Sequence, residues 1–173
     1  MTSRLFLVGF MGSGKTTLGK LLALELEYQF LDLDDYIESQ ERKTITEIFA
    51  ETGETGFREL EKQCLNTLGT REHIVLSTGG GTPCYHGNMD WMNHHGTTIF
   101  LQNSPEVLFE RLSKQKFHRP LIAKMDESGL KSFIETKLIE RQGYYVQAQI
   151  QLVALPSPEA SVKYLIKILN DIP

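Results

Sequence analysis

The feature of this chain that most restricts its fold is a glycine-rich segment near the N-terminus. Residues 9–16 read GFMGSGKT and match the pattern G-x-x-x-x-G-K-[ST]. The segment follows an apolar run at 5–8 that is typical of a buried strand. It precedes a stripe of leucines at 17–26 that is typical of a helix. A strand, a glycine-rich loop and a helix in this order predict an α/β fold whose loop binds phosphate.

The residue types of this loop suit a polyanionic ligand. Glycines let the backbone curl so that successive N–H groups point at one anion, and the dipole of the following helix adds to the attraction. We expect Lys15 to reach the terminal phosphates of ATP, and the hydroxyl of Thr16 to ligate Mg²⁺. ATPases, GTPases and metabolite kinases share such a loop. A guanine-reading segment of the Asn/Thr-Lys-x-Asp type is absent from the sequence, which argues against a GTPase.

Apolar runs alternate with helical patterns along the rest of the chain. A second short strand is predicted to end near residues 31–32. Further strands are predicted at 74–76, 98–101 and 149–155, and further helices at 36–41, 44–51, 55–68, 105–113, 130–142 and 158–169. Strands separated by helices favour parallel pairing, with helices on both faces of the sheet. Because the chain has no repeats and no linker, residues 1–173 are predicted to form a single domain.

Charge and composition exclude several classes of partner. The net charge of −4 offers no broad positive field for nucleic acid or an anionic membrane. Lys15 and three glycines interrupt the N-terminal apolar run, far short of the ~20 apolar residues that a membrane span needs. Cys64 and Cys84 do not have the spacing of a zinc site. We therefore expect a cytoplasmic protein that keeps both thiols reduced.

Two carboxylates lie at the end of the second predicted strand. Asp32 and Asp34 are two residues apart and would share one side of that strand. Ligands of open α/β sheets bind beyond the carboxyl ends of the strands, so the pair should face the glycine-rich loop. One carboxylate could hold the water shell of Mg²⁺ and the other could accept the proton of an attacking hydroxyl. Alternatively, Asp34 and Asp35 only cap the next helix.

Two further segments indicate a second ligand. Arg58 is predicted in the first turn of the helix at 55–68, where the helix dipole disfavours a cation. A grip on a substrate carboxylate would explain it, and so would a surface ion pair with Glu54 or Glu61. Three consecutive glycines, residues 79–81, follow the third strand and would allow a ligand to approach the backbone closely.

A polar stretch separates two predicted helices in the second half of the chain. Its residues 114–126 are expected to form a mobile lid that excludes water from the reaction. Arg119 lies within it and would swing toward the transferring phosphoryl group. Arg141 lies near the end of the following helix, where the dipole alone already favours a cation.

Together these segments resemble the shikimate kinase family. The ordered motifs that carry the resemblance are GFMGSGKTT, DLD, IFAETGETGFRELE, STGGG, RPLI and ERQGYY, and they span essentially the whole chain. The resemblance implies a three-layer α/β/α P-loop kinase fold with a five-stranded parallel sheet and a mobile lid. It also implies that ATP, with Mg²⁺, phosphorylates the 3-hydroxyl of shikimate in aromatic amino-acid biosynthesis, giving shikimate 3-phosphate and ADP.

The resemblance also assigns roles to individual residues. Those implied for ATP are Gly12, Ser13, Gly14, Lys15, Thr16, Thr17 and Arg119, with Thr16 and Asp32 at the metal. Those implied for the acid are Asp34, Arg58, Gly80, Gly81 and Arg141. Lys15, Asp34 and Arg119 would be catalytic, and Arg111 and Pro156 lie where the family places contacts to adenine. The partners expected are small molecules only, ATP and shikimate, with the chain acting as a monomer.

The sequence departs from the family pattern beside Arg141. The family usually has Pro-Leu-Tyr there, whereas residues 142–145 read Gln-Gly-Tyr-Tyr, so the helix packing around Arg141 could differ. Two alternatives to shikimate phosphorylation stay open. One is another small-acid kinase of the gluconate kinase type, because its acceptor also carries a carboxylate and hydroxyls. The other is a nucleotide-binding relative that has lost catalysis.

Overall fold

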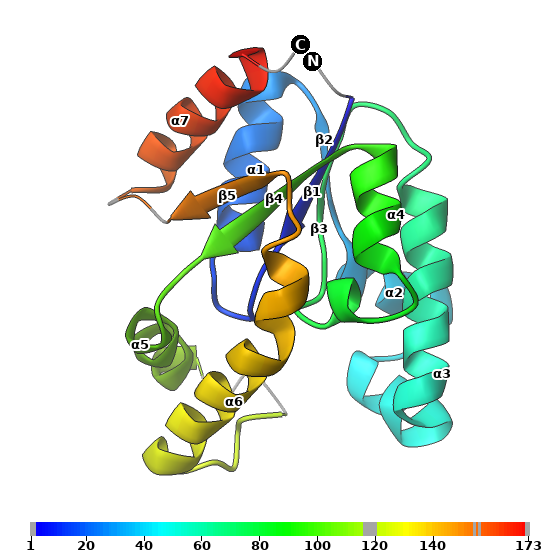
Figure 1. The fold of residues 1–173 in the computed structure, drawn as a ribbon. Helices are drawn as coiled ribbons and strands as arrows, with labels where there is room; N and C mark the ends of the chain where they lie inside the picture. Colours follow the sequence, from blue (N-terminus) through cyan, green and yellow to red (C-terminus); the bar gives the residue numbers. More distant parts are fainter. Residues whose placement is uncertain (1–2, 116–120, 154, 156, 172–173) are drawn as a thin grey trace.

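A parallel β-sheet forms the centre of the molecule (Figure 1). The structure is a computed structural model and describes residues 3–115, 121–153, 155 and 157–171. The strands are β1 (Arg4–Val8), β2 (Gln29–Asp32), β3 (Ile74–Ser77), β4 (Thr97–Gln102) and β5 (Ile150–Val153). They lie in the order β2-β3-β1-β4-β5, and each neighbouring pair is parallel. The predicted five-stranded parallel sheet is therefore confirmed.

The helices connect the strands and cover both faces of the sheet. They are α1 (Lys15–Leu26), α2 (Leu33–Glu41), α3 (Ile45–Leu68), the short 3-10 helix η1 (Thr82–Cys84), α4 (Asn88–His95), α5 (Pro105–Gln115), α6 (Glu127–Tyr145) and α7 (Pro158–Asp171). One prediction is confirmed in detail and one helix was missed. The two helices expected at 44–51 and 55–68 are the two segments of α3, which meet at Gly53, where φ of 66° and ψ of −176° are not helical. Helix α4 was not predicted, because Met89 and Met92 alone make too short an apolar stripe.

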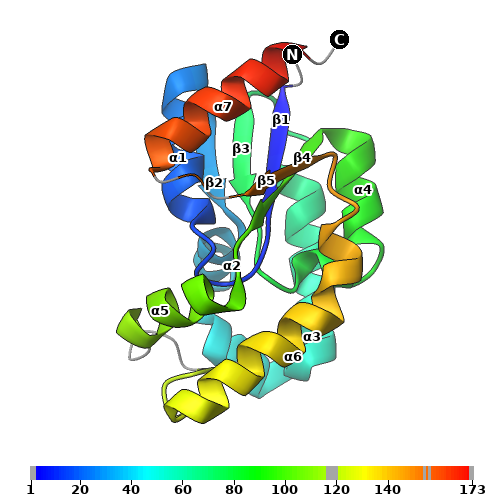
Figure 2. The same cartoon turned by 60° about the vertical axis from the view of Figure 1, so that its left-hand side comes forward.

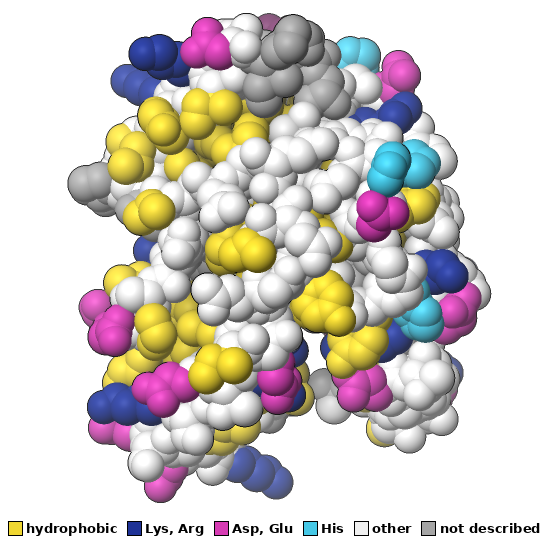
Figure 3. Space-filling view, viewed as in Figure 1, with side chains coloured by type: hydrophobic (Ala, Val, Ile, Leu, Met, Phe, Trp, Pro, Cys, Tyr) yellow, Lys and Arg dark blue, Asp and Glu magenta, His cyan; other side chains and the backbone are white. Residues whose placement is uncertain are grey.

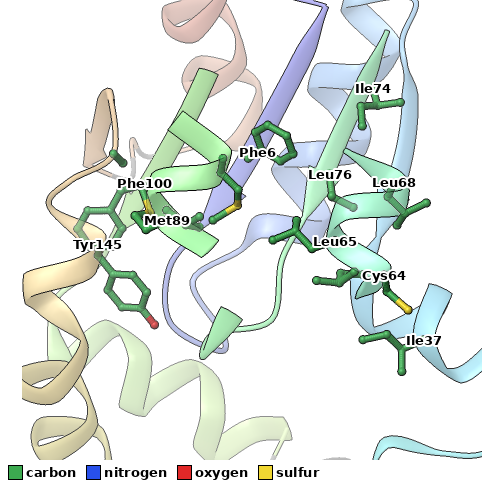
Figure 4. Close-up of a cluster of buried hydrophobic side chains, with 14 of the residues drawn as sticks. Phe6, Ile37, Cys64, Leu65, Leu68, Ile74, Leu76, Met89, Phe100 and Tyr145 are labelled. Atoms are coloured by element: carbon green, nitrogen blue, oxygen red, sulfur yellow. The ribbon is translucent and has the colours of Figure 1, made fainter. Parts of the chain in front are cut away.

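Two apolar clusters lie on opposite faces of the sheet and make the three layers. Strand β1 supplies both, because successive side chains of a strand point to opposite faces. Phe6 and Val8 pack toward α2, α3 and α4, where Leu65 and Leu68 meet the sheet (Figure 4). Leu5 packs on the opposite face, in the cluster under α1 and α7. A central strand buried on both faces explains why its apolar run is continuous.

Helices α5 and α6 lie beyond the carboxyl edge of the sheet (Figure 2). A third apolar cluster joins them to the glycine-rich loop. Phe10 of the loop packs there with Leu112 of α5 and Ile134 of α6, and all three are buried. Ile122, in the expected lid, is fully buried in the same cluster. The segment that returns from the lid is therefore anchored to the loop that is predicted to hold phosphate.

Gly143 gives the first testable prediction, because it occupies an exposed position in α6. A Cβ built there meets no atom within 4 Å. Gly143→Ala should raise the free energy of unfolding by ~0.5–1 kcal/mol, since alanine loses less backbone entropy in a helix. Urea denaturation measures this change. Gly56→Ala in α3 is the matched control and should destabilise, because its Cβ would lie 2.4 Å from the Cβ of Thr52.

The described residues also bear on membrane association. Within those ranges, no helix combines the length and the apolar character required to cross a lipid bilayer.

Candidate active site

A cavity of about 620 Å³ opens at the carboxyl edge of the sheet, between the glycine-rich loop and the segment after β3. In the space-filling view a notch separates the lobe of α5 and α6 from the lobe of α3 (Figure 3). Nine residues predicted for the site line the cavity: Gly12, Ser13, Gly14, Lys15, Thr16, Thr17, Asp32, Asp34 and Gly80. The fold thus brings together residues from three separate sequence motifs.

The glycine-rich loop is shaped to receive an anion. Gly12 and Gly14 have φ of 77° and 100°, a region that favours glycine, and α1 begins directly after Gly14. The ammonium of Lys15 is buried and donates to the carbonyl oxygens of Gly9 and Phe10, at 2.8 and 3.0 Å. Ser13 Oγ is buried and has no hydrogen-bond partner among the described residues. The start of a helix and the positive end of its dipole therefore face the cavity.

Asp32 and Asp34 both reach the cavity, but the reason given by the sequence was wrong. Strand β2 ends at Asp32, and Asp34 already lies in the first turn of α2. The two carboxylates therefore do not share one side of a strand. Asp32 caps α2 by accepting the backbone N–H of Asp34 at 3.1 Å, so the alternative that Asp34 and Asp35 provide the cap is also wrong. The other oxygen of Asp32 accepts from the Thr16 hydroxyl at 3.3 Å.

The carboxyl of Asp34 has an unusual proton affinity. Burial, with the nearby charges of Asp32 and Glu61, raises the pKa of Asp34 from its ordinary 3.8 to about 7, and the ammonium of Lys15 opposes this change. Groups that transfer protons near neutral pH need a pKa close to 7, which aspartate reaches only when it is desolvated beside other negative charges. The site therefore contains a carboxyl that can hold or release a proton at neutral pH.

The three glycines at 79–81 lie against three different functional side chains. A Cβ on Gly79 would lie 3.1 Å from Oδ1 of Asp34, and one on Gly80 would lie 3.2 Å from Nη1 of Arg141. A Cβ on Gly81 would lie 2.7 Å from Nη2 of Arg58. An acidic group and two guanidinium groups therefore converge on the backbone of this turn, and the approach is closest at Gly81, where a Cβ would displace Arg58.

Arg58 is held more firmly than the sequence suggested. It is buried near the start of the second helical segment of α3, five residues after the break at Gly53. Both ion pairs that were considered are present: Nη1 lies 2.9 Å from Glu61, and Nη2 lies 3.3 Å from Glu54. The ring of Tyr85 covers the guanidinium at 4.3 Å. The pairs surround a buried cation beside Gly81, so they do not reduce Arg58 to a surface residue.

Glu61 and Tyr85 are contacts of the site that the sequence analysis did not assign. Glu61 is 1% exposed and also accepts a hydrogen bond from the Thr82 hydroxyl. The sequence had offered the contact between Arg58 and Glu61, three residues apart on one helix, only as a surface ion pair, whereas the structure buries it. Tyr85 lies 27 residues after Arg58, counted along the chain, and only the turn at 79–81 brings the two together.

Arg141 comes to the same turn from α6. Its guanidinium lies 5.6 Å from the ring centre of Phe10 and next to Gly80. Tyr145, in the segment that departs from the family pattern, is fully buried, stacks on Phe100 and donates its hydroxyl proton to the carbonyl of Gly80. Tyr145 therefore ties the end of α6 to the glycine turn.

The remaining predicted residues divide between described and undescribed parts of the chain. Arg111 in α5 lines the cavity and donates to the carbonyl oxygens of Gly12 and Ser13, at 3.2 and 3.1 Å. Arg119 and Pro156 lie outside the described residues. Among the described residues, no group of three or more metal-ligating side chains forms a complete metal site.

The fold and the site together define a class of protein. The parallel sheet has the strand order described above, a phosphate-binding loop follows its central strand β1, and carboxylates lie at the end of β2. These features define a P-loop phosphotransferase. The chain belongs to the shikimate kinase family, because the family model described as "Shikimate kinase" matches residues 11–170.

Individual relatives agree with this assignment. The chain is 48% identical over 172 residues to a shikimate kinase of Bacteroides fragilis, covering 96% of each protein. It matches the crystal structure of shikimate kinase from Bacteroides thetaiotaomicron with a TM-score of 0.95 and 44% identity, over 98% of this chain and 99% of that one. Shikimate kinase from Acinetobacter baumannii in complex with shikimate matches with a TM-score of 0.88 and 32% identity, over 99% and 96%.

Proposed function

We propose that this enzyme transfers the γ-phosphate of ATP to the 3-hydroxyl of shikimate, giving shikimate 3-phosphate and ADP. The observation that carries the proposal is the convergence of Asp34, Arg58 and Arg141 on the turn at 79–81. Two guanidinium groups suit the single carboxylate of the acid. A carboxyl with a raised pKa suits its reacting hydroxyl, and the loop at 9–16 receives the phosphates opposite them.

Positioning and charge account for the chemistry that these residues would perform. Backbone N–H groups of the loop and Lys15 would hold the phosphates, and Arg58 and Arg141 would fix the acid so that its hydroxyl faces the γ-phosphorus. Asp34 would orient that hydroxyl and accept its proton as the bond to phosphorus forms. Charge on the transferring group is spread over its oxygens, so the cations stabilise the transition state.

Mg²⁺ fits the residues that face the phosphates. The Thr16 hydroxyl and the Asp32 carboxylate are 3.3 Å apart, and both are oxygen ligands of the kind Mg²⁺ prefers. Two such side chains suffice because Mg²⁺ usually keeps several waters and takes phosphate oxygens from its nucleotide. We propose that Thr16 ligates the ion directly and that Asp32 holds its water shell, where the ion would neutralise the phosphate charge.

The lid and the domain organisation belong to the same proposal. We propose that residues 114–126 form a lid on a single domain of residues 1–173, and that Arg119 reaches the phosphates when the lid closes. Ile122 packs in one cluster with Phe10. This contact supports the proposal because it joins the end of the lid to the phosphate loop. Excluding water by closure would favour transfer to the acid over hydrolysis.

A product assay tests the proposed function directly. The protein is incubated with ATP, Mg²⁺ and shikimate, and mass spectrometry should show the acid gaining one phosphate while ADP accumulates. Gluconate is the control acceptor, since a gluconate kinase type would phosphorylate it instead. ATP binding without shikimate-dependent ADP release would support the non-catalytic alternative.

The cellular setting is proposed on chemical grounds. We propose that the enzyme acts as a monomer in the cytoplasm, with no nucleic acid or membrane partner, in aromatic amino-acid biosynthesis. Cys64 and Cys84 are both free thiols in the structure, as a reducing compartment would keep them. All three parts of the proposed site come from one chain, so a second copy is not needed to complete it.

A further inference from the structure

The guanidinium of Arg58 has two carboxylate partners that differ in their freedom to move. Glu61 is 1% exposed, lies 2.9 Å from Nη1 and is also bound by the Thr82 hydroxyl. Glu54 is 57% exposed and lies 3.3 Å from Nη2. Because Glu61 is enclosed, it cannot leave Arg58 without becoming a buried, unpaired charge. Glu54 can leave, since water is available to its carboxylate.

Glu54 is held beside Arg58 by a second contact. The oxygen that faces Arg58, Oε1, also accepts the hydroxyl proton of Tyr85 at 2.8 Å. The Tyr85 hydrogen bond and the charge of Arg58 hold the pKa of Glu54 below its usual 4.5, so Glu54 is ionised at neutral pH. Glu54 directly follows the kink at Gly53, where the helical backbone is interrupted.

These contacts place one more negative charge on Arg58 than the cation can balance. One guanidinium charge faces two carboxylate charges, before any acidic substrate arrives. Arg141 supplies a second cation beside Gly80, but an entering carboxylate can take the place at Nη2 of Arg58 only if Glu54 leaves it. Glu54 is the exposed one of the two carboxylates and is free to do so.

We propose that Glu54 occupies the place of the substrate carboxylate on Arg58 in the free enzyme, and that binding of the acid displaces it. This inference rests on the proposed function, in which Arg58 binds that carboxylate. Glu54 is then an internal competitor that weakens the binding of every simple anion. Shikimate overcomes it because its hydroxyls add contacts at Asp34 that a simple anion lacks.

Glu54→Gln is the variant that tests the proposal. Glutamine keeps the length of the side chain and its ability to accept from Tyr85, but it removes the competing charge. Partly exposed ion pairs are worth up to ~1 kcal/mol, so KM for shikimate should fall about two- to five-fold. Calorimetric titration with shikimate alone should show the same decrease in Kd. We expect kcat and KM for ATP to stay unchanged.

Glu59→Gln is the matched control. Glu59 lies on the same helix next to Arg58 in sequence, but its carboxylate is exposed and faces Gln63 and His86 instead. The variant removes the same charge and should leave KM for shikimate unchanged. An equal decrease in both variants would assign the effect to net charge and overturn the proposal.

Tyr85→Phe gives a second, independent test. It removes the hydroxyl that holds Glu54 and keeps the ring on Arg58, so KM for shikimate should again fall, by less than in Glu54→Gln. Adding Tyr85→Phe to Glu54→Gln should produce no further decrease, since both changes act through one carboxylate. Additive decreases would contradict this mechanism.

The outcomes separate this inference from the proposed function. A higher KM for shikimate in Glu54→Gln would mean that Glu54 orients Arg58 for the substrate, and the proposal would be wrong while the function stood. An unchanged KM would also reject it. Arg58→Ala serves as the reference for the function: if that variant kept the wild-type KM, Arg58 would not bind the acid at all, and both ideas would fail.

Discussion

Replacing Asp34 with asparagine should reduce kcat by roughly 10²- to 10⁴-fold, the contribution expected of a positioned general base. Asparagine keeps the shape of the side chain and cannot accept the proton. Steady-state kinetics at saturating ATP and shikimate measure the change. Asp35→Asn is the matched control, because Asp35 is the next residue of α2 and its side chain is exposed. A kcat close to wild type in Asp34→Asn would remove Asp34 from the chemistry.

The raised pKa of Asp34 adds a pH dependence to this prediction. With a pKa of about 7, wild-type kcat/KM should increase as pH rises through about 7 and decrease about tenfold per unit well below it. The same titration should be absent from Asp34→Asn, whose residual activity comes from positioning alone. A profile that stays flat from pH 5 to 8 in the wild type would contradict the role of base.

As pH rises through about 7, the free energy of unfolding should decrease while activity increases. The folded pKa of Asp34 lies above its ordinary 3.8, so the protonated carboxyl favours the folded state at low pH. This contribution is lost as pH rises through about 7. At pH 8 Asp34→Asn should therefore be more stable than wild type by ~1–3 kcal/mol, with the gain vanishing near pH 4. Urea denaturation at both pH values checks the sign.

The second large effect is expected when either arginine of the acid site is removed. Arg58→Ala and Arg141→Ala should each raise KM for shikimate at least ~30-fold, because truncating one partner of a desolvated charge pair costs ~2–5 kcal/mol. A carboxylate grip acts on substrate and transition state alike, so kcat should change much less. KM for ATP is measured in parallel and should stay near wild type.

The two arginine variants should differ in stability. Arg58→Ala leaves Glu61 buried without its cation, which should cost ~3–5 kcal/mol of folding free energy. Among the described residues Arg141 forms no ion pair, so Arg141→Ala should unfold close to the wild-type temperature. Arg141→Ala is therefore the cleaner kinetic test. Lys131→Ala, which removes a cation elsewhere on α6, should leave KM for shikimate unchanged.

Much of the fold could be predicted because its signals are local. The strand at 5–8 is a continuous apolar run, and at the start of α3 Thr44 and Glu47 form a capping box from residues three apart in the sequence. Helix α4 was missed since Met89 and Met92 are buried by contacts with other elements. The break between the two helices of α3 was predicted as well, and the structure places it at Gly53, whose positive φ favours glycine.

The candidate site was predicted in part. Contacts between residues close together in the sequence could be predicted, and contacts between residues far apart could not. The residues of the glycine-rich loop are contiguous, so their spacing alone carries the chemistry of phosphate binding. The sequence alone explained only part of the need for three glycines at 79–81. That need depends on Asp34, Arg58 and Arg141, which approach the turn from three different helices.

By itself, the sequence determined the alternation of strands and helices, the phosphate loop and the resemblance to one family, since each depends on neighbouring residues or ordered motifs. Only the tertiary structure decided that Asp32 caps α2, that Glu54 and Glu61 share Arg58, and that burial brings the pKa of Asp34 to about 7. Desolvation and charge proximity arise from packing between distant segments, and these quantities do not exist until the chain has folded.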